Sequence, residues 1–189
     1  MIDLDAKLQA VAEIIEGRVI RDDPRVQVSV KGSVLGFPAT LEAVQSGWPF
    51  GVMYFLETQV VEDPSKINAE RDPLTLTIMP RMGRGLLRFF SHILLFESTG
   101  QTVGDKGLES QFVFQYNESA LAERFVKYPG NSDRLVRLEE FSKFGELSVK
   151  SDAGIFLSQP KSFTALDLDV CRETFRLVGE LGQVLFESF

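Results

Sequence analysis

Few residues of this chain are able to act as a nucleophile or as a general base. Among its 189 residues are one histidine, His92, and one cysteine, Cys171. A Ser–His–Asp or Cys–His mechanism needs a base within hydrogen-bond reach of the nucleophile, so each would have to use His92. We interpret His92 as a structural or surface polar residue, and Cys171 as a core residue because free cysteine is usually buried. We therefore expect no catalytic residues, and the sequence favours a protein that is not an enzyme without deciding the question.

Residues that bind metals and nucleotides are equally sparse. Structural zinc sites use three or four cysteines and histidines, more than the two in this chain. The acidic pairs Asp22–Asp23, Glu139–Glu140 and Asp167–Asp169 each have a local explanation, which is a turn, a solvated helix face and a helix N-cap respectively. Gly83 and Gly85 lack the Lys-Ser/Thr that follows the glycines of a phosphate-binding loop. We expect neither a metal nor a cofactor.

The main candidate for a binding surface is the segment 81–96. It concentrates three arginines in an acidic protein and places bulky apolar residues beside them. If it is a helix, Arg88 and His92 share a narrow polar stripe on an apolar cylinder, which could lie at a membrane interface or dock on a partner. The alternative, which we favour, is a buried connecting helix or strand whose arginines pair with acids. The binding residues of this segment would be Arg81, Arg84, Arg88, Phe89, Phe90 and His92.

A further candidate is Trp48, which lies between Gly47 and Pro49. A tryptophan at such a break is either an exposed anchor at the tip of a turn or a lid over the core, because its ring is apolar and its N–H needs a polar partner. We favour the lid over the anchor.

Composition is that of an ordinary globular protein with an excess of phenylalanine. Hydrophobic residues make up 44% and charged residues 25% of the chain, which has sixteen phenylalanines. Because phenylalanine has no polar atom to satisfy, this excess predicts a bulky aromatic core, or a pocket or interface lined with rings. A net charge of −7 opposes attraction to phosphates, so we expect no nucleic-acid partner.

The sequence also bears on location. It opens without the basic and apolar regions of a secretory signal, and a single cysteine cannot form an intramolecular disulfide, so we expect a cytoplasmic protein. The longest apolar stretch, residues 86–96, is interrupted by Arg88, Ser91 and His92. It is also shorter than the roughly 18 to 20 residues that a span requires. We expect no transmembrane segment.

Two periodicities predict the elements of the first half of the chain. Apolar residues at three- and four-residue spacing predict a helix over 3–17. Strict alternation of apolar and polar residues predicts strands over 26–31, 37–43, 52–60 and 74–78. Because short turns join these strands, we expect an antiparallel meander, since parallel neighbours would need crossover helices between them.

The second half mixes the same two patterns. We expect a fifth strand over 112–116, a helix that Asn117 or Ser119 caps, a helix over 132–143, two brief strands on either side of residues 152–154, and a long helix that begins near Asp167 or Asp169. The fold class is therefore α+β, with helices packed on a mostly antiparallel sheet of a four-strand meander plus further strands. We interpret residues 1–189 as one domain, with two sub-halves, about 1–98 and 99–189, as the alternative.

A short motif precedes the fifth strand. It consists of Gly104-Asp105, Leu108-Glu109 and Phe112-Val113-Phe114, and a helix, a small strand pair and a C-terminal helix follow it. From Gly104 onward the chain thus resembles a bacterial domain family of unassigned function, which occurs alone or attached to membrane segments. Relatives usually have Phe-Asp in place of Leu108-Glu109. The resemblance implies the α+β fold and no particular activity, and we interpret Glu109 as structural.

These observations predict a non-enzymatic protein-interaction or binding module. The missing catalytic set and the many aromatic residues favour a protein partner or a homo-oligomer. One alternative is an apolar small-molecule pocket, or an enzyme, between the sheet and the C-terminal helix, where concave sites often form. Another is peripheral membrane association through residues 81–96.

Overall fold

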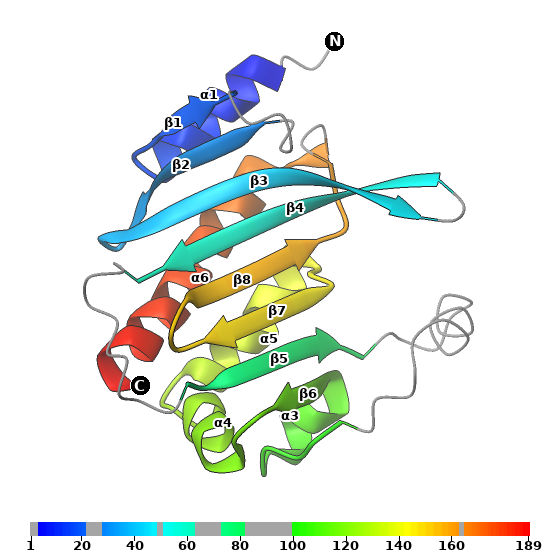
Figure 1. Ribbon diagram of the computed structural model, residues 1–189, viewed down its shortest axis with the longest axis vertical. Helices are drawn as coiled ribbons and strands as arrows, with labels where there is room; N and C mark the ends of the chain where they lie inside the picture. The colour runs from blue at the N-terminus through cyan, green and yellow to red at the C-terminus, as the bar shows by residue number, and fades with distance from the viewer. Residues whose placement is uncertain (1–3, 22–27, 49–50, 63–72, 82–99, 163–164) are drawn as a thin grey trace.

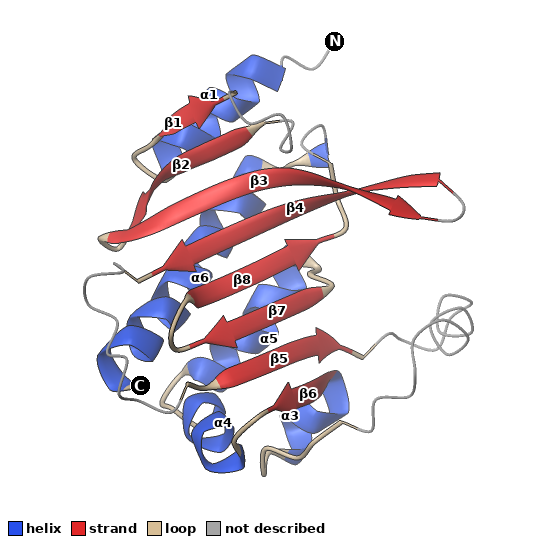
Figure 2. Cartoon of the chain, viewed as in Figure 1, coloured by secondary structure: helices blue, strands red, loops and turns tan. Residues whose placement is uncertain are grey.

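The protein consists of one antiparallel sheet with helices on one of its faces (Figures 1 and 2). The computed structural model describes residues 4–21, 28–48, 51–62, 73–81, 100–162 and 165–189. Within these ranges the helices are α1 (Leu4–Ile14), α3 (Lys106–Gln111), α4 (Ser119–Val126), α5 (Asn131–Ser142) and α6 (Leu168–Ser188). The strands are β1 (Arg18–Ile20), β2 (Ser29–Val34), β3 (Phe37–Trp48), β4 (Gly51–Val61), β5 (Thr75–Pro80), β6 (Phe112–Tyr116), β7 (Glu146–Lys150) and β8 (Gly154–Gln159). The predicted α+β class is confirmed.

The eight strands lie in the order β1-β2-β3-β4-β8-β7-β5-β6, and every neighbouring pair is antiparallel. The four-strand meander is present as β1 to β4. Its membership differs from the prediction, because the strand at 74–78 forms β5 on the far side of the β8–β7 hairpin. The three residues of β1, which begin the meander, are too few to show an alternating pattern. Both halves of the chain contribute to this one sheet, while the division into sub-halves stays a prediction.

Alternate residues of the central strands are buried beneath the helices. Leu41, Leu56, Leu157 and Leu147 are almost inaccessible to solvent, and each lies on a different strand of the sheet's centre. Helix α6 packs behind β2, β4 and β8, and α5 packs against α6 (Figure 1). Phe112, Phe114, Phe125 and Phe175 are among the largest fully buried side chains. The described part of the chain thus has a buried aromatic cluster, which is one of the uses that the sequence predicted for its phenylalanines.

The N-cap predicted for α6 is confirmed, whereas the one predicted for α4 is not. Asp167 caps α6, because its Oδ1 accepts hydrogen bonds from the backbone N of Asp169 at 2.9 Å and of Val170 at 3.2 Å. The prediction that Asn117 or Ser119 caps α4 is wrong. Glu118 is the cap, and Asn117 instead accepts a hydrogen bond from the backbone N of Thr75 at 2.8 Å, which ties the end of β6 to β5.

Two glycines allow α1 to lie against the start of the sheet. The backbone N of Ser33 donates to the carbonyl oxygen of Ile15 at 2.6 Å, so the end of α1 touches β2 directly. A Cβ on Gly32 would collide with that carbonyl oxygen and would lie 2.7 Å from the Cα of Gly17. Both contacts are with backbone, which cannot rotate away. Only glycine fits at this position without displacing α1.

We therefore expect Gly32→Ala to lower the free energy of unfolding by about 1 to 3 kcal/mol, the usual cost of overpacking. Gly145→Ala is the matched control, because its Cβ would meet its nearest neighbours at 3.8 and 3.9 Å, which is ordinary contact. The control should change stability by less than about 1 kcal/mol. Urea denaturation monitored by circular dichroism measures both, and equal effects would contradict the close approach.

Candidate functional site

Most of the predicted binding segment lies outside the part of the chain that the structure describes. This holds for Arg84, Arg88, Phe89, Phe90 and His92, so their predicted role as a binding surface stays a prediction. Arg81 is described and exposed. Its backbone N donates to Gln111 O at 2.7 Å, and its Nε donates to Glu109 O at 2.8 Å. Arg81 thus ties the end of β5 to the end of α3.

Trp48 is described only through its backbone. It is the last residue of β3 and pairs with Gly51, the first residue of β4, at the tip of the β3–β4 hairpin. Whether its ring is an anchor or a lid stays a prediction.

Cys171 lies on the buried stripe of α6, with 4% of its surface exposed. Burial raises the pKa of its thiol to about 12, because the anion would lose its hydration. A thiol with this pKa is protonated at neutral pH and is a poor nucleophile. The prediction that Cys171 packs in the core is confirmed.

A hollow of about 560 Å³ opens at one end of the molecule, between α4, the end of α6 and the start of β5. Its polar lining is already engaged. Ser151 accepts a hydrogen bond from Leu74 N at 2.8 Å, and Arg124 donates to Ser188 O at 2.5 Å while its guanidinium lies 4.6 Å from the centre of the Phe189 ring. The described side chains between the sheet and α6, where the sequence placed an alternative pocket, are largely buried core residues.

The sheet face opposite the helices is covered by no helix among the described residues (Figure 1). It carries the residues that alternate with the core residues, and most of them are half-buried or exposed. Hydroxyl and amide groups dominate this face, with Phe156 among them. We call it the open face and define it by Lys31, Thr40, Glu42, Glu57, Gln59, Thr77, Gln115, Glu146, Ser148, Lys150, Phe156 and Ser158. The Nζ of Lys150 lies 5.7 Å from the centre of the Phe156 ring.

Strand register brings three carboxylates into one row on the open face. Glu42 pairs directly with Glu57, Glu57 pairs with Ser158, and Ser158 pairs with Glu146. We call Glu42, Glu57 and Glu146 the acidic row. Within the described part of the chain, none of the three carboxylates takes part in an ion pair or a side-chain hydrogen bond. Directly opposed like charges on neighbouring strands destabilise a sheet, so this row is unfavourable for folding.

The central carboxylate of the acidic row is electrostatically perturbed. Burial raises the pKa of Glu57 above its ordinary value of 4.5, and the negative charges of Glu42 and Glu146 raise it further. A cation placed over the row would lower this pKa and relieve the repulsion. No described group of Cys, His, Asp and Glu residues has the arrangement of a metal site.

Sequence reasoning missed the acidic row. Alternation indicates that Glu42 and Glu57 lie on the polar faces of their strands. The sequence of a single strand does not show which residue of a neighbouring strand it pairs with. Glu146 lies 89 residues after Glu57 in the sequence and comes near it because the β8–β7 hairpin inserts next to β4.

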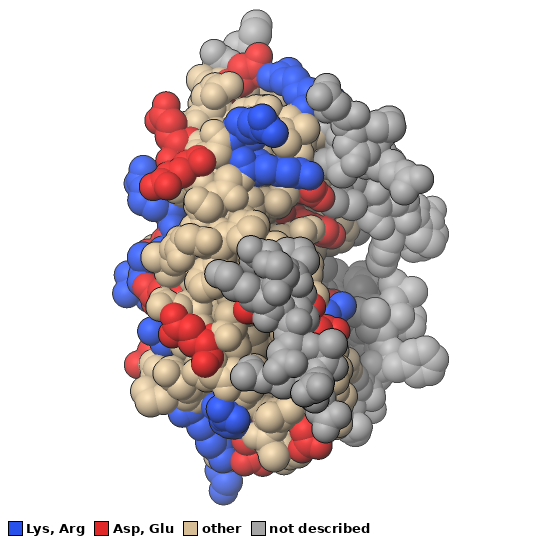
Figure 3. Space-filling view, turned by 60° about the vertical axis from the view of Figure 1, so that its left-hand side comes forward, with Lys and Arg blue, Asp and Glu red and all other residues tan. Residues whose placement is uncertain are grey.

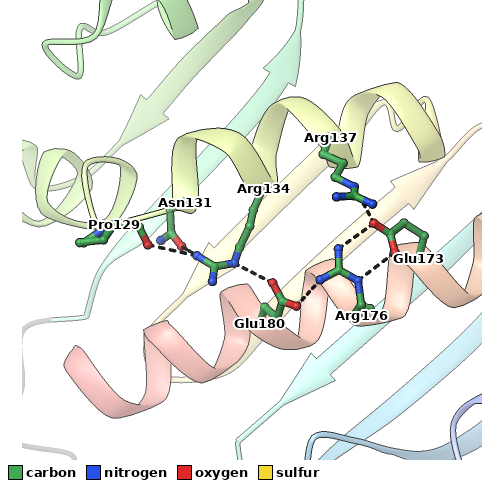
Figure 4. A network of polar contacts seen from close by, with 7 residues as sticks. All are labelled: Pro129, Asn131, Arg134, Arg137, Glu173, Arg176 and Glu180. Carbon is green, nitrogen blue, oxygen red and sulfur yellow. Dashed lines mark hydrogen bonds and ion pairs between the residues drawn. The ribbon is translucent and has the colours of Figure 1, made fainter.

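A second charged cluster joins α5 to α6, and its groups are paired (Figure 4). Arg134 Nε contacts Glu180 Oε2 at 2.8 Å, Arg176 contacts both Glu180 and Glu173, and Arg137 Nε contacts Glu173 Oε1 at 2.7 Å. The hydrogen bond from Arg176 lowers the pKa of Glu173. Its stabilising effect is therefore present above the ordinary pKa of 4.5 and is lost as pH falls through the lowered value. The five groups form a structural tether.

Across the surface in view in Figure 3, acidic and basic side chains are interspersed. No described helix is long and apolar enough to span a bilayer. No protein-family model, curated protein or solved structure matches this chain. The resemblance to a bacterial domain family therefore stays a prediction.

We expect Glu57→Gln to stabilise the protein at pH 7 by about 0.2 to 1 kcal/mol, the range for cross-strand pairs. Because folding raises the pKa of Glu57, this carboxyl binds more protons in the folded state than in the unfolded state between about pH 4.5 and the raised pKa. The contribution of Glu57 to stability should therefore fall as pH rises through that raised pKa, and the substitution should remove this contribution. Chemical denaturation at pH 4 and pH 7 measures the difference, which should vanish at pH 4.

Glu140→Gln is the matched control for this experiment. Glu140 is exposed on α5 and lies far from the open face, so its substitution should leave the pH dependence unchanged. A Glu57→Gln protein that is less stable than the wild type at pH 7 would contradict the assignment of repulsion to the acidic row.

We expect Glu180→Gln to lower the free energy of unfolding by about 1 kcal/mol at low salt, and by less as salt screens the tether. Glu180 contacts two arginines, and about a quarter of its side chain is exposed. Glu187→Gln on the same helix is the control, because Glu187 accepts only from the neutral Gln183 at 2.9 Å. Denaturation at two salt concentrations tests this, and a loss that does not depend on salt would argue against an ionic tether.

Proposed function

We propose that this protein is a non-enzymatic interaction module that binds a basic partner protein on the open face of its sheet. The observation that carries the proposal is the direct pairing of Glu42 with Glu57. Neither carboxylate has a cationic partner within the described residues, and Glu57 is half-buried with a raised pKa. This arrangement costs stability, and a partner's arginine or lysine placed over it would turn repulsion into attraction.

The shape and chemistry of the open face favour a protein over a small molecule. Small-molecule sites are concave and mostly apolar, whereas this face is one side of a sheet of eight strands. A row of Thr40, Gln59, Phe156, Ser148 and Thr77 crosses five neighbouring strands beside the acidic row. Its hydroxyl and amide groups both donate and accept hydrogen bonds, and Phe156 offers an apolar contact. An interface built on polar groups around a few aromatic contacts would fit here.

Net charge supports the same partner. At −7, the protein attracts cationic proteins over long range and repels polyanions. The interaction should therefore form quickly at low ionic strength and weaken as salt is added. A cytoplasmic location is part of this proposal, and the single cysteine is consistent with it because an intramolecular disulfide cannot form.

The proposal is tested by site-specific photocrosslinking followed by binding measurements. A photoreactive amino acid at Gln59 should crosslink a partner in cells, whereas the same group at Glu140, on the helix side, should not. The crosslinked peptide of the partner should carry Arg or Lys beside the attachment point. With the purified partner, the double substitution Glu42→Gln/Glu57→Gln should weaken binding at least about tenfold, a loss consistent with the removal of charge-assisted contacts.

Salt dependence provides the second criterion. Binding of the wild type should weaken with added salt, and the double variant should show a shallower dependence because two charges are gone. Crosslinks from Glu140 alone, or a partner whose affinity is indifferent to both Glu42 and Glu57, would overturn the assignment of the open face.

A further inference from the structure

The β3–β4 hairpin continues past the strands that flank it. Pairing of β2 with β3 ends at Glu42, and pairing of β4 with β8 begins at Leu56. Beyond these points β3 and β4 pair with each other and with no other described strand, from Val44 with Phe55 to Trp48 with Gly51. We call residues 44–48 and 51–55 the arm. The arm stands out from the sheet in Figure 1, and no described strand pairs with its outer edges.

The arm has an unusual composition for an outlying element. From Ala43 to Leu56 the sequence has no charged residue in 14 positions, whereas a quarter of the whole chain is charged. Gly51–Phe55 of β4 reads Gly-Val-Met-Tyr-Phe, which is rich in residues that favour strands. Exposed strand edges usually carry proline or a charged residue, most often lysine, which prevents pairing with other chains. The β4 edge of the arm carries none of these.

The alternation of backbone hydrogen bonds shows which amides of the β4 edge of the arm point outward. Ala43 N donates to Val28 O at 3.3 Å, so the amide of Ala43 points away from β4. Leu56 is the cross-strand partner of Ala43, and in an antiparallel pair the amide of Leu56 then points away from β3, toward β8. With the period of two, the amides of Tyr54 and Val52 point the same way. They lie beyond the last residue of β8 that pairs with β4, which is Gln159.

We propose that this edge, Gly51–Phe55, pairs antiparallel with the same edge of a second copy of the chain. A free edge offers backbone donors and acceptors that another strand satisfies, and an antiparallel pairing of two identical edges closes with two-fold symmetry. Two copies of net charge −7 repel each other, and a segment without charge is where contact is least opposed. Insertion of the arm into a bilayer is disfavoured, because open strand edges cannot be satisfied in hydrocarbon.

Pairing of two copies through the arm is independent of the proposed function, because it involves neither the acidic row nor a basic partner. If either interaction proves absent, the other can still occur. Self-association concerns a backbone edge and should be insensitive to Glu42→Gln/Glu57→Gln, whereas partner binding should depend on those carboxylates.

The experiment is light scattering after gel filtration over a range of protein concentrations. One chain has a mass of 21.2 kDa, and the apparent mass of the wild type should approach twice this value as concentration rises. Tyr54→Pro removes an outward amide while leaving the β3–β4 bonds in place, since proline is tolerated where the amide of an edge strand faces outward. It should raise the dimer dissociation constant about tenfold or more, because symmetry removes two hydrogen bonds at once.

Gln45→Pro is the matched control. Gln45 pairs with Tyr54, so its amide lies on the opposite edge of the same arm, and its substitution should leave the dimer unchanged. Circular dichroism and thermal melting establish that both variants fold. A wild type of 21.2 kDa at all concentrations, or a dimer that Gln45→Pro disrupts and Tyr54→Pro does not, would overturn the proposal.

Oxidative crosslinking gives a readout that does not depend on proline. Met53→Cys should form a disulfide-linked dimer under mild oxidation, and the wild type should not, since its only thiol, Cys171, is buried and has a raised pKa. Flotation with phosphatidylglycerol vesicles tests whether the arm binds a membrane surface instead of a second copy. A chain that binds vesicles as a monomer and forms no Met53→Cys crosslink would refute pairing between copies.

Discussion

One-sided burial of the sheet is the constraint on which the rest of the structure depends. Every central strand places alternate residues under the helices, as Leu41, Leu56 and Leu157 show, and α6 spans several strands from behind. With a period of two, a slip of one residue in any strand would expose its apolar set. Register is therefore firmly set on the helix side, and it fixes the open face as a consequence.

This coupling explains how an unfavourable arrangement persists. Glu42 and Glu57 oppose each other because Leu41 and Leu56, their neighbours, are held in the core. The repulsion amounts to about 1 kcal/mol or less, whereas burial of one leucine side chain contributes about 1.5 to 3 kcal/mol. The core thus decides the register, and the acidic row follows from it. Natural proteins commonly keep such local costs where they bind something.

Sequence reasoning recovered the features that local chemistry fixes. Asp167 caps α6, the β7–β8 hairpin forms around residues 152–154, and Glu109 is structural as predicted, because it accepts bonds from Val103 N at 2.8 Å and Gly104 N at 2.9 Å. Strand order could not be predicted, because the sequences of β4 and β5 do not show that the later β7–β8 hairpin lies between them in the sheet. The acidic row depends on that order, so it was equally hidden. The arm was partly visible, since the break at Gly47-Trp48-Pro49 marks its tip.

The β3–β4 hairpin contributes to both proposed surfaces, and the distance between the acidic row and the arm decides whether they interact. Glu57 lies four residues from Met53, which is about 13 Å along a strand. If two arms pair around Met53, their acidic rows lie roughly 26 Å apart, about three Debye lengths at physiological salt. Repulsion between the two acidic rows is then largely screened by salt. The two copies can therefore pair whether or not a basic partner neutralises the rows. Each copy would keep an open face of its own, and a dimer could bind two partners independently.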